Sequence, residues 1–111
     1  MQVIERDDLK AWLDEGRSFS LVEVLQPEAF QHFHLPQAIN VPYRSAGFPE
    51  ALRMAVPDSR APVVVYGQGE SCELAAEAAR LLDGFGYQQV YVYAGGKTDW
   101  RTAGLAIEQR R

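Results

Sequence analysis

The strongest constraint on the fold is an unbroken apolar run, Pro-Val-Val-Val-Tyr at 62–66, which leads into a loop and then a helix. A β-branched run without polar alternation is typical of a strand that is covered on both faces of a sheet. The next residues, Gly-Gln-Gly-Glu-Ser at 67–71, predict a loop. Residues 72–86 are rich in Ala and Leu and predict a helix that Gly84 and Gly86 end. A buried strand followed by a loop and a helix is the repeating unit of a parallel α/β sheet.

Other segments of the chain repeat this alternation of short strands and helices. Strands are predicted at 20–25, 38–42 and 88–93. Helices are predicted at 7–15, 27–33 and 44–55, and a last helix opens at Gly95-Gly96 and ends at Gly104. The pattern predicts an α/β fold, with a small parallel sheet of about five strands, right-handed crossovers and helices on both faces. Neither a linker nor a repeat interrupts the sequence, so we expect one domain over residues 1–111.

Composition and charge exclude several classes of partner. The 111 residues carry a formal net charge of -4, which argues against binding to nucleic acid or to an anionic membrane surface. The single cysteine, Cys72, allows no intramolecular disulfide and suits a reducing compartment. The first ten residues are charged where a signal peptide is apolar, and no apolar stretch has the length of a membrane span. We therefore expect a cytoplasmic protein, and no cofactor motif is present.

The loop at 67–71 is the candidate functional site. In parallel α/β sheets, ligands bind beyond the carboxyl ends of the strands, and this loop joins such an end to the best-patterned helix. The free N–H groups at a helix start favour an anion or a thiolate. The candidate substrate-binding residues are Gly67, Gln68, Gly69, Glu70 and Ser71. For the two glycines, a turn that needs permissive backbone angles is an equally open interpretation.

Cys72 ends this loop and is the candidate catalytic residue. A thiolate at a helix start can carry or relay sulfur, whereas a free cysteine can also be a compact apolar residue. The helix start favours the thiolate by roughly 0.3–1 kcal/mol. The flanking acids Glu70 and Glu73 oppose it by about 0.5–1 kcal/mol each in a watery setting. Basic residues that follow strand ends either draw an anion to the site or are solvated surface charges; they are Arg44, Lys97 and Arg101.

Three segments, in order, resemble the rhodanese family over nearly the whole chain. Residues 21–42 resemble the family's run from an Asp-Val-Arg strand to Gly-His-Ile-Pro-Gly-Ala-Ile-Asn, with matches at His34, Pro36, Ala38, Ile39 and Asn40. Residues 63–82 occupy the places of the strand, the active-site loop and the helix. The closing pattern, in which Gly-Gly precedes Trp and then Gly-Leu, is matched at Gly95, Gly96, Trp100, Gly104 and Leu105. The resemblance implies the rhodanese fold and sulfur transfer through a cysteine persulfide.

The sequence also departs from the family pattern. The family's cysteine directly follows the strand, where this chain has Gly67, and the arginine of Asp-Val-Arg is Leu25. The resemblance implies a structural role in a turn for His34. We expect no metal at the His32/His34 pair, with His32 facing solvent, and we expect Trp100 to be a packing residue.

Three functions remain open. The first is a sulfurtransferase-like protein that carries sulfur on Cys72, taken from a small sulfur donor or a persulfide-bearing protein. The second is a catalytically inactive rhodanese-homology domain with a binding or regulatory role, as the replacement of the family cysteine by Gly67 suggests. The third is a redox-sensing thiol that forms a mixed or intersubunit disulfide through Cys72. No oligomeric state is predicted.

Overall fold

The structure is a computed structural model that describes residues 1–44, 46–71 and 73–109. Ten elements follow one another along the chain: β1 (Gln2–Val3), α1 (Arg6–Asp14), β2 (Ser20–Glu23), α2 (Pro27–His32), β3 (Ile39–Asn40), α3 (Phe48–Ala55), β4 (Val63–Tyr66), α4 (Leu74–Gly84), β5 (Val90–Tyr93) and α5 (Gly96–Thr102). No helix in the described part of the chain is long and apolar enough to cross a membrane.

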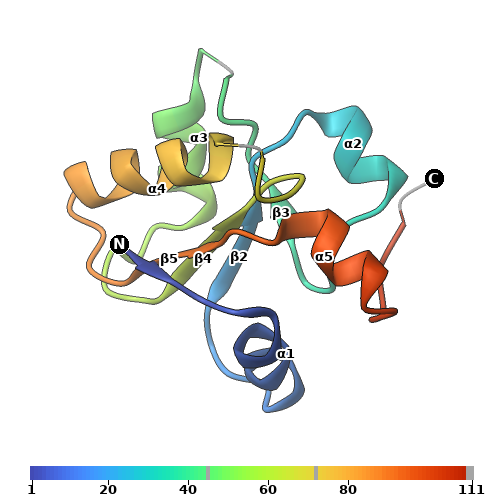
Figure 1. The fold of residues 1–111 in the computed structure, drawn as a ribbon. Coiled ribbons are helices and arrows are strands. Elements are labelled where there is room, and N and C mark those ends of the chain that lie inside the picture. The colour runs from blue at the N-terminus through green and yellow to red at the C-terminus, as the bar shows by residue number, and fades with distance from the viewer. Residues whose placement is uncertain (45, 72, 110–111) are drawn as a thin grey trace.

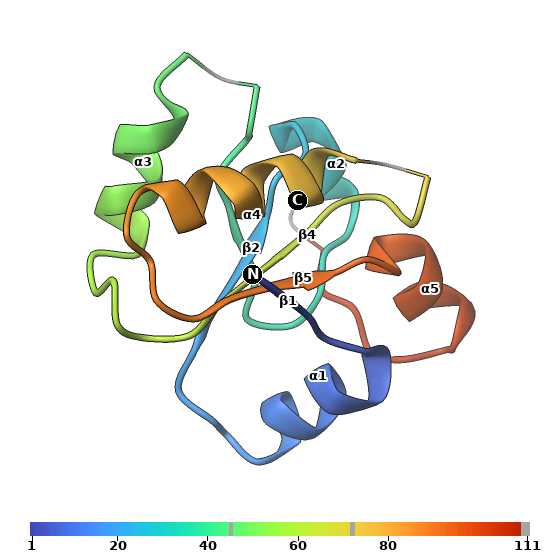
Figure 2. The ribbon, with the colours of Figure 1, turned by 60° about the vertical axis from the view of Figure 1, so that its left-hand side comes forward.

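The five strands form one sheet in the order β1-β5-β4-β2-β3, and every neighbouring pair is parallel. Helices cover both faces: α3 and α4 lie on one side of the sheet, and α1 and α5 lie on the other (Figures 1 and 2). The predicted α/β architecture is therefore confirmed. Strand β4 lies in the middle of the sheet, so the loop that follows it starts from the best-covered part of the molecule.

The side chains of β4 alternate between two apolar cores. Val63 and Val65 point to the core under α3 and α4, and Val64 and Tyr66 point to the core under α1 and α5. All four are fully buried. This double coverage explains why the run lacks polar residues, since a strand buried on both faces has no solvent side. Trp100 packs in the second core, as predicted.

Strands β2, β3 and β5 are shorter than predicted, and two other elements differ more. The helix expected over 44–55 begins only at Phe48, because Pro49 is tolerated in a first helical turn and disrupts a helix interior. Strand β1 was not predicted. It has two exposed residues and pairs with β5 alone, so its sequence carries no burial pattern that marks a strand.

Candidate active-site loop

The loop between β4 and α4 has a buried base and an exposed tip. Gly67 is buried and Gly69 is half-buried, whereas Gln68, Glu70 and Ser71 are exposed. The predicted catalytic residue, Cys72, lies outside the described residues. The following residue, Glu73, is the N-cap of α4 and makes no side-chain capping hydrogen bond.

The first turn of α5 holds the base of this loop. The backbone N–H of Lys97 donates to the carbonyl of Gly67 at 3.1 Å, and the N–H of Thr98 donates to the carbonyl of Gln68 at 2.9 Å. This close contact between the start of α5 and the loop requires glycine at position 96. Its φ is +61°, and a Cβ there would lie 2.5 Å from the carbonyl oxygen of Gly67. The Gly-Gly pair before α5 therefore lets the helix start come into contact with the loop.

A cavity of about 470 Å³ opens between the loop and α5. Four of the five candidate binding residues line it, and α5 with its preceding residue supplies the opposite wall. The lining residues are Gln68, Gly69, Glu70, Ser71, Gly95, Thr98, Asp99 and Thr102. The Gln68 side chain connects the loop to α5, because its Nε2 donates to Thr98 Oγ1 at 3.2 Å. Gly67 does not line the cavity. Its carbonyl accepts the hydrogen bond from the N–H of Lys97 in α5.

Among the described residues of this cavity wall, both charged side chains are acidic. Asp99 is partly neutralised, since Arg6 Nη1 lies 2.9 Å from its Oδ1 and the Tyr93 hydroxyl donates to its Oδ2 at 2.6 Å. Burial and the neighbouring Asp99 carboxylate raise the pKa of Tyr93, so the phenol stays a donor. Glu70 has no ion-pair partner among the described residues. A dianion entering the cavity would therefore meet an uncompensated carboxylate.

A buried network of polar side chains lies at the carboxyl ends of β2 and β4. Glu23, the last residue of β2, receives the Tyr66 hydroxyl on Oε1 at 2.9 Å and the Lys97 ammonium on Oε2 at 3.3 Å. The ammonium also donates to the carbonyl of Ala29 at 2.7 Å and lies 4.3 Å from the centre of the Phe33 ring. Glu23 and Lys97 are 0% and 1% exposed, so both side chains are almost completely desolvated.

Burial shifts both partners toward their neutral forms. Desolvation raises the pKa of Glu23, against the attraction of the Lys97 ammonium, which lowers it. Desolvation likewise lowers the pKa of Lys97, and Glu23 opposes that shift. Each charge of the pair therefore depends on the other, because removing one residue would leave the charge of its partner in an apolar environment.

The burial of Lys97 corrects both interpretations of this residue. It neither attracts an anion into the cavity nor lies in solvent. The signal that could have revealed it is helical spacing: Lys97 and the packing residue Trp100 are three apart and share one face of α5. Arg44 and Arg101 are exposed, and neither lines the cavity beside the loop.

Of the two histidines, His34 has the structural role that the resemblance implies. His34 is buried, its Nδ1–H donates to the carbonyl of Phe30 at 2.8 Å, and its ring stacks on Phe30 at 3.8 Å. His32 is exposed. Within 1–44, 46–71 and 73–109, no three His, Cys, Asp or Glu side chains gather as a metal site.

Comparison with known proteins agrees with this geometry. The family model for the rhodanese-like domain matches residues 5–103. A thiosulfate:glutathione sulfurtransferase of Saccharomyces cerevisiae is 30% identical over 93 residues, which are 76% of this chain and 66% of that protein. An HTH-type transcriptional regulator of Mycobacterium tuberculosis, Rv0324, is 32% identical over 95 residues, 86% of this chain. The chain spans only 40% of the length of that regulator.

A solved structure shows the same fold. The crystal structure of a thiosulfate sulfurtransferase from Pseudomonas aeruginosa superposes with a TM-score of 0.85 at 30% identity. The match covers 99% of this chain and 20% of that one. Since the family model covers most of the sequence and the fold agrees, the chain belongs to the rhodanese-like domain family.

Proposed function

We propose that this protein carries sulfur as a persulfide on Cys72. The observation that supports the proposal is the loop's position: it follows the central strand and its residues 68–71 line a cavity. The only thiol of the chain comes next in the sequence. Residues 1–111 act as one rhodanese-like domain, and a chain with one thiol suits the reducing cytoplasm.

The transfer step needs no oxidant and no cofactor. The Cys72 thiolate attacks the outer sulfur of a donor persulfide, a new S–S bond forms, and the donor's own S–S bond breaks. The donor leaves as a thiolate, and the proton of its outer S–H stays on the transferred sulfur, which gives a Cys72 persulfide. Attack by an acceptor thiolate on that outer sulfur reverses the exchange and regenerates Cys72.

The acidic cavity wall favours an organic donor over thiosulfate. Glu70 is unpaired among the described residues, and Asp99 lies beside it on the wall of the cavity. These carboxylates repel thiosulfate, a dianion, more strongly than they repel a persulfide on a small thiol or a protein. The donor class is therefore a low-molecular-weight or protein-bound persulfide.

Intact-protein mass spectrometry tests the proposal. The reduced protein is incubated with glutathione persulfide or with thiosulfate and then weighed. We expect a mass gain of one sulfur atom from the persulfide, faster than from thiosulfate, and no gain in the Cys72→Ser variant. If no donor adds sulfur to the wild-type protein, carriage on Cys72 is wrong.

The second candidate function is a non-catalytic module that binds or regulates. Two observations favour it: Gly67 stands where the family's cysteine follows the strand, and one relative is a transcriptional regulator. In this case neither donor adds sulfur. Restoring the family cysteine with Gly67→Cys would then create a sulfur-accepting site that the wild type lacks, and the same mass measurement reports it.

A further inference from the structure

Lys97 joins the base of the loop to the buried network of polar side chains. Its backbone N–H donates to the carbonyl of Gly67 at 3.1 Å, and its side-chain ammonium lies 3.3 Å from Glu23 Oε2. Lys97 is buried and does not line the cavity beside the loop. One residue therefore contacts the loop with its main chain and the end of β2 with its side chain.

Three contacts fix the ammonium of Lys97. Besides the Glu23 carboxylate, they are the carbonyl of Ala29 in α2 at 2.7 Å and the ring of Phe33, the C-cap of α2, at 4.3 Å from its centre. Because the site is desolvated, an ammonium that left these partners would lie in an apolar environment. The contacts therefore hold the side chain in one place, and with it the first turn of α5.

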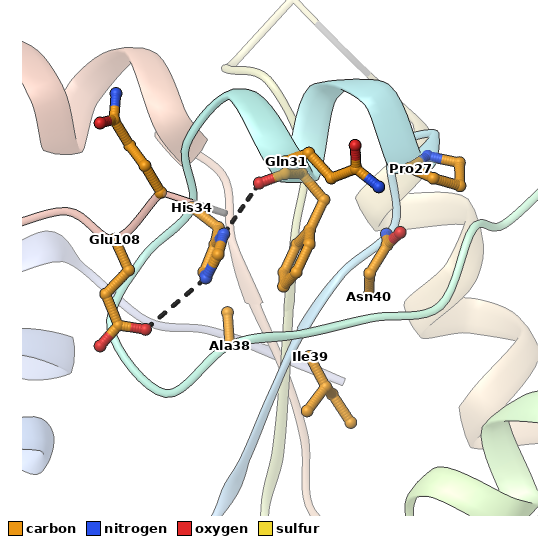
Figure 3. A pocket seen from close by; sticks show the side chains of 9 residues that line it. Pro27, Gln31, His34, Ala38, Ile39, Asn40 and Glu108 are labelled. Atoms are coloured by element: carbon orange, nitrogen blue, oxygen red, sulfur yellow. Dashed lines mark hydrogen bonds and ion pairs between the residues drawn. The ribbon is translucent and has the colours of Figure 1, made fainter. Parts of the chain in front are cut away.

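Helix α2, which supplies part of this anchor, is held at its end by other contacts. His34 Nδ1 donates to the carbonyl of Phe30 at 2.8 Å, and Nε2 lies 3.6 Å from Glu108 Oε1 (Figure 3). The backbones of His34 and Glu108 also exchange two hydrogen bonds of 2.8 Å. The carbonyl that accepts from the ammonium therefore belongs to a helix that the segment after α5 keeps in place.

The strand that leads into the loop contacts the same pair. Tyr66, the last residue of β4, donates its hydroxyl to Glu23 Oε1 at 2.9 Å, and the two residues are register partners in the sheet. On the helix side, the N–H of Thr98 donates to the carbonyl of Gln68 at 2.9 Å. The buried pair is thus connected to the loop through both β4 and α5.

We propose that Lys97 is a positioning residue for sulfur transfer. Its pair with Glu23 fixes the start of α5 against Gly67 and so sets the course of the loop that precedes Cys72 in the sequence. This role presupposes the proposed sulfur carriage by Cys72. Since Lys97 does not line the cavity, its loss should slow the transfer step, which depends on precise placement, and leave donor binding unchanged.

The variant Glu23→Gln/Lys97→Met removes the pair without leaving a buried charge. Sulfur uptake from glutathione persulfide is followed by intact-protein mass at several donor concentrations. We expect the rate at saturating donor to fall on the order of tenfold to a hundredfold, with an unchanged half-saturating concentration. Tyr87→Phe is the matched control: it removes a buried hydrogen bond in the other core and should take up sulfur like the wild type.

Amide hydrogen exchange measures the contact between α5 and the loop without a sulfur donor. In the wild type, the amide of Lys97 should exchange as slowly as the amides of β4, through opening of the whole domain. In the double variant it should lose about tenfold more protection than the β4 amides. In Tyr87→Phe the two should change together.

The results separate this role from the proposed function. If the wild type takes up no sulfur, carriage on Cys72 is wrong, and the Lys97 amide alone decides whether the pair holds the loop. If the wild type takes up sulfur and the double variant does so at the same rate, the positioning role is wrong. Rapid exchange of the Lys97 amide in the wild type, with β4 still protected, would overturn it equally and needs no variant to fold.

Discussion

Replacing Lys97 with Met should strongly destabilise the fold, because it leaves the Glu23 carboxylate buried without its cation. The variant loses the ammonium contacts to Glu23 Oε2 at 3.3 Å and to the carbonyl of Ala29 at 2.7 Å. Glu23 keeps only the Tyr66 hydroxyl among these partners. Removing one member of a buried pair typically costs about 3–5 kcal/mol, a large share of the roughly 5–15 kcal/mol that stabilises a domain.

The loss should depend on pH in a defined direction. Without Lys97, the pKa of Glu23 rises further above its ordinary value of 4.5, because burial is then opposed only by weaker contacts. The folded state then holds a proton that the unfolded state releases, so the unfolding free energy of Lys97→Met falls as pH rises above that value. The variant therefore recovers stability, relative to wild type, as the pH is lowered.

Urea unfolding at two pH values measures this effect, with the fluorescence of buried Trp100 as the signal. The control is the double variant Glu23→Gln/Lys97→Met, which removes the stranded charge and should be more stable than Lys97→Met at neutral pH. The reasoning is refuted if Lys97→Met costs less than about 1 kcal/mol at neutral pH, a loss that any ordinary substitution gives. A loss that does not change with pH would refute it equally.

Four further substitutions test the loop and the packing of the domain. Gly96→Ala places a Cβ 2.5 Å from a loop carbonyl and should cost more than about 2 kcal/mol in chemical unfolding. Gly104→Ala has positive φ but open space and should cost only about 1 kcal/mol; equal losses would contradict the contact. Glu70→Gln should speed sulfur uptake from thiosulfate about two- to fivefold in the mass assay, with a smaller gain at high salt. Tyr87→Phe removes a buried hydrogen bond of 2.6 Å to the carbonyl of Val56 and should cost about 1–2 kcal/mol at an unchanged denaturant slope.

The sequence predicted the strands and helices whose residues carry a clear period or an uninterrupted apolar run. Residues 63–66 are the clearest case, because a run without polar residues predicts burial on both faces of the sheet. The location of the loop followed from the same argument. Strand β1 could not be predicted in this way, since its partner Tyr91 lies far along the chain and its own side chains stay exposed.

The contacts that shape the site depend on residues distant in the sequence. Nothing near Lys97 in the sequence reveals that its ammonium lies against Glu23, and nothing near Gly67 reveals that α5 contacts its carbonyl. A charged side chain is on the surface in most proteins, so the usual expectation failed at Lys97. The bridge between His34 and Glu108 could not be predicted for a similar reason, because the two residues lie far apart in the sequence.

The strand order has a consequence for how the chain folds as it is synthesised. Every strand pair is parallel, so none closes through a short hairpin, and each needs a complete crossover. Strand β1 leaves the ribosome before the other four strands, yet its partner β5 is the last of the five to be made. The nascent chain can pair β2 with β3 and β4 before β5 is made, while β1 stays unpaired. Closing the sheet at β1 is therefore expected to be the last step, after the strand that bears the loop has found both neighbours.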